Sequence, residues 1–244
     1  MSPGDKAILV IGAGESTGAA VAKRFAREGF VACVARRNGA KLAPLVEEIE
    51  AAGGRAIAFG TDARKEEQVV ELVETIEREV APIEVAVFNV GANVKFGIRE
   101  TTARVYYKVW EMACFGGFLM GREVAKVMVP RGRGTILYTG ATASVRGAAG
   151  FSAFAGAKHA KRALAQSMAR ELGPLGIHVA HVVIDGPIDT PWIRENMADM
   201  IANRPEDGGL LEPDAIAEAY WQLHCQPKSA WTWEMDLRPW AEPW

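Results

Sequence analysis

The sequence has few cysteines and no excess of either charge. Its 244 residues include three cysteines, Cys33, Cys114 and Cys225, which lie far apart and form no metal-type pair. We therefore expect buried, reduced thiols rather than a disulfide framework or a metal site. Lysine and arginine number 28 against 30 for aspartate and glutamate, and the formal net charge is −2. This balance gives no electrostatic reason to expect binding to nucleic acid or to an anionic membrane.

Long hydrophobic runs are also absent. No apolar run approaches the ~18 residues that a membrane span needs, and the chain passes from Met1-Ser-Pro-Gly-Asp-Lys6 into a strand-like run without the pattern of a secretory signal. A cytoplasmic location is therefore expected. The composition, 49% hydrophobic and 24% charged, suits one globular domain over residues 1–244. No internal repeat or linker divides it.

Strand-like apolar runs alternate with amphipathic helical patterns along the chain. This order implies one parallel sheet with helices on both faces. The predicted helices are Ala19–Glu28, Lys41–Ala52, Glu66–Val80, Val105–Val129, Ser152–Leu172 and Glu212–Trp221. The predicted strands are Ala7–Ile11, Val31–Ala35, Ala56–Phe59, Val85–Asn89, Thr135–Tyr138, Ile177–Ile184 and Trp231–Leu237.

The stretch around which the chain is organised runs from Thr135 to Leu172. A short apolar run bounded by glycines predicts a buried strand, and a loop of small residues, Gly140–Gly150, follows it. In the helix predicted next, Lys158 lies one turn after Phe154, so these two side chains share a face.

This stretch resembles the catalytic segment of the short-chain dehydrogenase/reductase family, in which a Tyr-x-x-x-Lys helix carries the acid/base tyrosine and a serine ends the preceding strand. The lysine is present as Lys158. The tyrosine position holds Phe154, the serine position holds Ala141, and the family's supporting asparagine falls on Ala113. The resemblance spans about residues 7 to 237. It implies a single Rossmann-type domain, α/β in class, with a doubly wound parallel seven-stranded sheet flanked by helices on both faces.

A glycine-rich turn follows the first predicted strand and leads into a helix, where backbone N–H groups can hold a pyrophosphate. Its spacing fits the family's Gly-x-x-x-Gly-x-Gly pattern, with a serine at the middle glycine. The resemblance therefore implies that the turn binds a nicotinamide dinucleotide through Gly12, Gly14, Ser16, Thr17 and Gly18. The alternative is an ordinary tight strand-to-helix turn.

Two arginines, Arg36 and Arg37, stand at the end of the second predicted strand. Dinucleotides without a 2′-phosphate usually meet an acidic residue here, whereas guanidinium groups suit a phosphate. We therefore favour NADP(H) over NAD(H). The alternative is a pair of solvated arginines at the edge of the sheet.

Further cofactor contacts are implied by the resemblance alone. Asp62 matches an adenine-contacting aspartate and is equally well explained as an N-cap of the next helix. Asn89 is expected to steady the central turns, and Gly91 to let the backbone approach the ribose. In the turn Ile184-Asp-Gly-Pro-Ile-Asp-Thr190, Ile188 is expected to hold the nicotinamide carboxamide and Thr190 to support it.

Two other features concern ligands. Residues 190–210 occupy the place of the family's substrate lid, and Trp192, Ile193, Met197 and Met200 are expected to line an apolar substrate pocket. His178 and His181 are an odd number of residues apart on one strand, so they point to opposite faces and cannot share a metal.

The aromatic helix Val105–Val129 resembles the family's dimer-forming helix and implies a homodimer or homotetramer. The tryptophan-rich tail, residues 238–244, is expected to dock on the body of the protein or on a partner subunit.

The substitutions limit the chemistry. Phe154 cannot transfer a proton, and losing a positioned acid typically forfeits about 10²–10⁴ in rate. No shifted tyrosine replaces it, because the position that enoyl reductases of the family use holds Phe151. Lys158 keeps its family role toward the nicotinamide ribose. The polar groups expected near the nicotinamide are Thr142, Ser144, Ser152 and Lys158.

Three interpretations of the function follow. The first is an NADP(H)-dependent oxidoreductase with another proton source, acting on a conjugated C=C or C=N bond of a small, partly apolar molecule. Conjugate hydride addition leaves an enolate that can take its proton from water. The second is an NADP(H)-binding sensor or partner-binding module without turnover. The third is non-redox chemistry of the kind seen in halohydrin dehalogenases, which show the opposite pattern of kept and lost residues.

Overall fold

The sheet of this protein is doubly wound and entirely parallel. The computed structural model describes residues 5–205 and 209–242. Within these ranges, seven strands pair in the order β3-β2-β1-β4-β5-β6-β7. The fold class predicted from the sequence is therefore confirmed. The strands are β1 (Ala7–Ile11), β2 (Val31–Arg36), β3 (Arg55–Gly60), β4 (Ile83–Phe88), β5 (Gly134–Thr139), β6 (Ile177–Ile184) and β7 (Glu234–Leu237).

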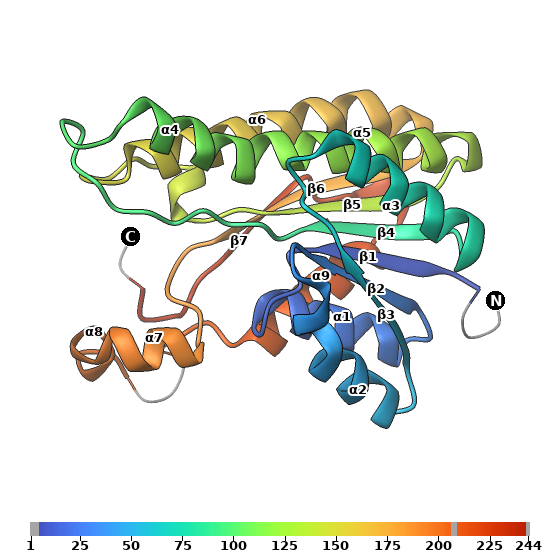
Figure 1. Ribbon diagram of the computed structural model, residues 1–244, viewed down its shortest axis with the longest axis horizontal. Coiled ribbons are helices and arrows are strands. Elements are labelled where there is room, and N and C mark those ends of the chain that lie inside the picture. Colours follow the sequence, from blue (N-terminus) through green and yellow to red (C-terminus); the bar gives the residue numbers. More distant parts are fainter. Residues whose placement is uncertain (1–4, 206–208, 243–244) are drawn as a thin grey trace.

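Helices cover both faces of the sheet (Figure 1). Helices α1, α2 and α9 lie on one face, and α3, α4, α5 and α6 lie on the other, while α7 and α8 stand apart at one end of the molecule. Their bounds are α1 (Thr17–Arg27), α2 (Ala43–Ala51), α3 (Glu66–Glu79), α4 (Ala103–Trp110), α5 (Gly116–Met128), α6 (Ser152–Leu172), α7 (Pro191–Asn196), α8 (Ala198–Ala202) and α9 (Pro213–His224).

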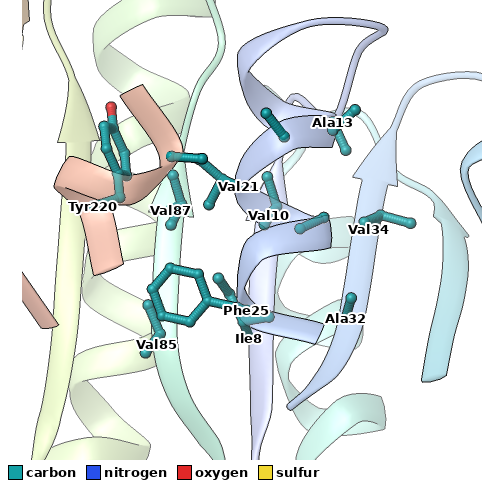
Figure 2. Packing of buried hydrophobic residues seen from close by; sticks show 14 of the residues in the cluster. Ile8, Val10, Ala13, Val21, Phe25, Ala32, Val34, Val85, Val87 and Tyr220 are labelled. Carbon is teal, nitrogen blue, oxygen red and sulfur yellow. The ribbon is translucent and has the colours of Figure 1, made fainter. Parts of the chain in front are cut away.

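The core explains why the central strands are largely apolar. Every residue of β1 and of β6 is buried, as expected for a parallel sheet covered on both sides. Figure 2 shows Val21 and Phe25 of α1 and Tyr220 of α9 packed over side chains of β1 and β4. Burial of such large apolar side chains stabilises the fold by roughly 1.5–3 kcal/mol each.

The long aromatic helix expected over Val105–Val129 is not one regular helix. Residues Glu111–Phe115 form a π-helical turn between α4 and α5. A π-turn inserts one extra residue into the helical repeat and changes which side chains face the sheet. Ala113, at the asparagine position of the family, lies inside this turn and is fully buried.

The C-terminal part differs from the prediction in two respects. Strand β7 begins at Glu234 rather than at Trp231, whose indole stacks on the imidazole of His178 with the ring centres 4.9 Å apart. Trp240 is 76% exposed, so the body of the chain buries little of it, and docking of the tail on a partner subunit stays a prediction. The last tryptophan of the tail lies outside the described residues.

The cysteine prediction holds for two thiols of the three. Cys33 and Cys114 are buried, whereas Cys225, directly after α9, is exposed. In residues 5–205 and 209–242, no helix combines the length and the apolar character needed to cross a bilayer.

Candidate functional site

The candidate site lies at the carboxyl ends of the strands where the strand order reverses, between β1 and β4. Ligands of open parallel sheets bind at such switch points. Two adjoining cavities of about 550 and 980 Å³ meet here, and both are lined by Gly14, Asn89 and Gly91. The smaller one extends over the ends of β2 and β3, and the larger one extends toward β5, α6 and α7.

The glycine turn between β1 and α1 is closed by contacts that leave no room for side chains. Gly12 has φ of +92°, and a Cβ at Gly18 would lie 2.4 Å from the carbonyl oxygen of Gly12. The amide Nδ2 of Asn89 donates to this same oxygen at 3.0 Å. Asn89 therefore ties the turn to the end of β4, the steadying contact expected from the sequence.

The turn leaves polar groups without partners. The hydroxyls of Ser16 and Thr17 are buried at the N-terminus of α1 and make no hydrogen bond with any described residue. A Cβ built at Gly91 meets no atom within 4 Å, so space remains above the backbone there. Orphaned hydroxyls and free N–H groups at a helix N-terminus fit an anionic pyrophosphate.

Arg36, Arg37 and Lys41 surround the smaller cavity. None of the three forms a salt bridge or a side-chain hydrogen bond within the described part of the chain. Sequence reasoning missed Lys41, which lies outside the family motifs and approaches the arginines through the turn before α2. Three cations gathered around one cavity favour a phosphate group as its occupant.

Asp62 lines the same cavity and is held by Arg64. The Nε of Arg64 donates to Asp62 at 2.8 Å, and its backbone N–H donates at 3.1 Å. The hydrogen bond from the Arg64 side chain is the main reason that the pKa of Asp62 is lowered. Helix α3 starts at Glu66 with Lys65 before it. The alternative role of Asp62 as the cap of this helix is therefore wrong.

The positions of the family's catalytic hydroxyls and amide lie in an apolar cluster. Phe154 is 8% exposed and packs in this cluster with Ala113 and Ala141. Phe151, Phe154 and Ala141 also line the larger cavity. The part of the cavity wall that holds the proton-donating tyrosine in the family's usual pattern is therefore apolar in this protein. The other members of the cluster are Ala92, Val94, Val105, Val109, Trp110, Met112, Ala143, Ala153, Ala155 and Ala157.

Lys158 is the polar exception in this wall. It lines the larger cavity, is only 4% exposed, and donates from Nζ to the carbonyl oxygens of Thr139 at 3.1 Å and Gly140 at 3.3 Å. Its ammonium lies 5.4 Å from the ring centre of Phe154. Burial lowers the pKa of Lys158 to about 8.

Sequence reasoning missed Lys161, one turn further along α6. Its side chain is fully buried, and its Nζ lies 5.3 Å from the ring centre of Phe88 without a hydrogen-bond acceptor in the described residues. Burial, and then the charge of Lys158, lower its pKa well below the ordinary lysine value. The available signal was the position of Lys161 beside the buried stripe of α6, which is unusual for a lysine.

The three other expected polar groups differ in position. Thr142 lines the larger cavity and donates its hydroxyl to Asp185, which occupies the family's proline position. Ser144, whose hydroxyl accepts from the N–H of Ala141, and Ser152 are not among the residues that line the cavity. Of the four groups expected near the nicotinamide, Thr142 and Lys158 therefore border the larger cavity.

The segment expected to form a lid lies beside the larger cavity. Ile188, Thr190, Trp192 and Ile193 line that cavity, and the hydroxyl of Thr190 caps α7 by accepting from the N–H of Ile193. Met197 and Met200, expected in the same pocket, are not among its lining residues. Residues 206–208 of this segment lie outside the described residues.

The two histidines of β6 contact β7 and the segment that leads into it. Nε2 of His178 contacts the carbonyl oxygen of Thr232 at 2.8 Å, and Nδ1 of His181 contacts Glu234 at 3.0 Å. The ring of His181 also fills the space beside Gly140, where a Cβ would lie 2.6 Å from it. The described residues contain no cluster of three or more metal-ligating side chains.

Comparison with known proteins agrees with this fold and site. A family model described as short chain dehydrogenase matches residues 6–201. A crystal structure of a short-chain dehydrogenase from Rhodopseudomonas palustris is 53% identical, with a TM-score of 0.84, over 97% of this chain and 99% of that chain. The chain therefore belongs to the short-chain dehydrogenase family, whose members are oxidoreductases.

Two further relatives bear on the cofactor. L-rhamnose 1-dehydrogenase (NAD(P)(+)) of Azotobacter vinelandii is 29% identical over 87% of each chain. An actinorhodin polyketide ketoreductase solved with NADPH has a TM-score of 0.88 at 24% identity, over 98% of each chain, and this likeness shows the fold alone.

Proposed function

We propose that this protein is an NADP(H)-dependent reductase of conjugated C=C or C=N bonds in small, partly apolar molecules. The observation that carries the proposal is the larger cavity, in which buried Lys158 adjoins the apolar side chains of Phe151, Phe154 and Ala141. At the family's tyrosine and serine positions, this wall offers no hydroxyl to a carbonyl oxygen, but it can bind an apolar conjugated system beside a dinucleotide.

The residues present fit NADP(H). The turn with Gly12, Gly14 and Gly18, together with the unpartnered hydroxyls of Ser16 and Thr17, would hold the pyrophosphate. The cavity with Arg36, Arg37 and Asp62 would take the adenosine and its 2′-phosphate. Asn89, Gly91, Lys158, Ile188 and Thr190 would border the nicotinamide and its ribose in the larger cavity. A relative named for NAD(P)(+) supports a nicotinamide dinucleotide as the cofactor, and the arginines are the reason to favour NADP(H).

The chemistry follows from what the wall lacks. When bound, NADPH supplies a hydride. Adding a hydride to a conjugated bond leaves an anion whose charge is delocalised onto oxygen or nitrogen. The rate of this reaction therefore depends less on an acid in contact with that atom than the rate of ketone reduction does. The apolar wall orients the substrate and excludes water, and those two effects supply most of what this site can contribute.

The segment 190–210 would close over the substrate. Trp192 is 62% exposed while lining the cavity, so its indole is available to cover a ligand that enters. Closure of such segments shields the reacting atoms from water. We extend the proposal to a single domain over residues 1–244, a cytoplasmic location and a homodimer or homotetramer.

A second function is favoured by one observation. Ala113 is fully buried and Phe154 nearly so, and both pack inside one apolar cluster. This packing suits a protein that binds NADP(H) and signals its presence without turnover.

One experiment separates the two functions. NADPH binding is first titrated by fluorescence, and NADPH oxidation is then followed at 340 nm with panels of enones, imines and simple ketones. The reductase proposal expects tight binding, with oxidation by enones or imines and little by ketones. Tight binding with no oxidation by any compound would support the sensor, and a preference for simple ketones would contradict both.

A further inference from the structure

Two buried lysines lie one turn apart on the inner face of α6. Lys158 lines the larger cavity, whereas Lys161 lies behind it and is fully enclosed. Neither forms a salt bridge with an acidic group in the described ranges. Two like charges buried side by side cannot both persist, so one of the two amines has to be neutral near pH 7.

The contacts show which lysine is neutral. As an ammonium, Lys158 donates to two backbone carbonyl oxygens, whereas an ammonium at Lys161 would have no acceptor within the described part of the chain. The two side chains lie one turn apart on α6, so the lone pair of a neutral Lys161 amine is available to the buried ammonium of Lys158. A hydrogen bond to this lone pair raises the pKa of Lys158 and so opposes the dominant effect of burial.

The other titratable groups around the pair do not change charge between about pH 6 and 8. His181 of β6 has its pKa lowered to about 4, mainly by burial, and Glu234 of β7 behind it also has a lowered pKa. Cys114 of the π-helical turn has its pKa raised by burial. Asp185 contacts Thr142 and Arg238 rather than the lysines. Near neutral pH, the lysine pair is therefore the group that exchanges a proton beside the cavity.

We propose that Lys158 is the proton donor of the reduction and that Lys161, as a neutral amine, keeps Lys158 protonated for this step. This inference rests on the proposed reductase function. Lys158 is the catalytic residue because it borders the reacting centre in the cavity, and Lys161 acts only through it as a positioning residue. The pair thereby supplies the proton that Phe154 cannot.

The step balances with groups already named. With NADPH bound, the conjugated bond would receive a hydride, and with it two electrons, from the dinucleotide, which would leave as NADP⁺. One N–H bond of Lys158 would then break, and the substrate anion would gain a C–H bond if a C=C bond is reduced or an N–H bond if a C=N bond is reduced. To donate to the substrate, Lys158 gives up the longer of its two hydrogen bonds to carbonyl oxygens, the one of 3.3 Å to Gly140. The neutral Lys158 left behind regains a proton from water that enters the cavity.

The test is a pH titration of the lysine ε-carbons by ¹³C NMR in the full-length protein without substrate. In the wild type, we expect the Lys158 signal, assigned with Lys158→Met, to titrate with a midpoint of about 8. In Lys161→Met, this midpoint should fall by half a unit or more, because burial then acts without the hydrogen bond. Lys126→Met, which removes a solvent-facing ammonium of α5, should leave it unchanged.

Two titration results would overturn the pairing. A wild-type midpoint near the ordinary lysine value of 10.5 would show that Lys158 is not desolvated. A midpoint that rises or stays constant in Lys161→Met would show that Lys161 is charged or remote. Because the wild-type measurement needs no variant of Lys161, poor folding of that variant would leave the first result decisive.

Kinetics tests the donor role. With an enone that the protein reduces, kcat of the wild type should fall as the pH rises above about 8. In Lys161→Met, this fall in kcat should occur at a lower pH, while KM for NADPH stays the same. An effect confined to KM for NADPH would show that Lys158 only binds the cofactor. Absence of turnover with every compound would overturn the donor role together with the proposed function, and the titration would still decide the pairing.

Discussion

Gly18 lies so close to the backbone of Gly12 that the glycine-rich turn has no room for a side chain at residue 18. A methyl group there would lie 2.4 Å from the backbone oxygen of Gly12, whereas one at Gly14 would meet nothing within 4 Å. We expect Gly18→Ala to lower the free energy of unfolding by about 1–3 kcal/mol, since backbone atoms cannot move aside as a side chain can. Gly14→Ala is the matched control and should unfold like the wild type in urea. Equal stability of both variants would contradict the observed turn.

Arg36 and Arg37 allow a test of cofactor choice by charge alone. Replacing both with alanine should weaken NADPH binding about 10- to 100-fold, because charge-assisted hydrogen bonds contribute about 1.5–3 kcal/mol. NADH lacks the 2′-phosphate, so its affinity should change little. Fluorescence titration of both dinucleotides measures this, with Arg78→Ala on the outer surface of α3 as control. Equal loss for NADH and NADPH would show that the arginines do not contact the phosphate.

At the scale of elements, the α4–π-turn–α5 unit has two different faces. Its inner face carries Ala113 into the apolar wall of the cavity, while Tyr106, Tyr107 and Phe118 remain partly exposed. Exposed aromatic side chains on one helical unit are typical of a subunit interface.

This outer face yields a prediction about assembly. Tyr107→Asp combined with Phe118→Asp should convert an oligomer into monomers, because two carboxylates would have to be buried in the interface. Light scattering coupled to size-exclusion chromatography reports the mass. The control is Leu175→Asp, which adds the same charge at an exposed apolar residue beyond the end of α6. An unchanged mass of the double variant would place the interface elsewhere.

At the scale of the whole molecule, the buried lysines couple stability to pH. A lysine whose pKa is lowered in the folded state binds its proton more tightly in the unfolded state, so it destabilises the fold below its unfolded pKa of about 10.5. This cost is complete below the folded pKa and disappears as the pH rises toward 10.5.

Lys161→Met removes this cost. We expect the variant to be more stable than the wild type by about 1–4 kcal/mol at pH 7, in line with replacing buried charged groups by apolar ones. The difference should shrink as the pH approaches 10.5, where unfolded Lys161 also loses its proton. Urea unfolding from pH 7 to pH 10 measures both effects. A variant less stable than the wild type at pH 7 would mean that Lys161 makes a favourable contact that the buried pair does not include.

Much of the fold was predictable because its determinants are local. The fully buried strand β1 is a continuous apolar run, and the glycines mark the first turn directly. The π-helical turn around Ala113 was not predictable, because an extra residue in a helical repeat leaves the hydrophobic pattern nearly unchanged. The exposure of Cys225 and Trp240 likewise depends on what packs nearby rather than on residue type.

The sequence by itself determined the alternation of strands and helices along the chain, the glycine-rich turn after the first strand and the absence of hydroxyls at residues 141 and 154, since each depends on residue types at fixed spacing. Only the tertiary structure decided that Lys161 is buried. Four of the five residues from Lys158 to Arg162 are polar, a pattern typical of a solvated helix face. Packing of α6 against β6 and the π-helical turn removes Lys158 and Lys161 from water, and that desolvation lowers the pKa of both amines.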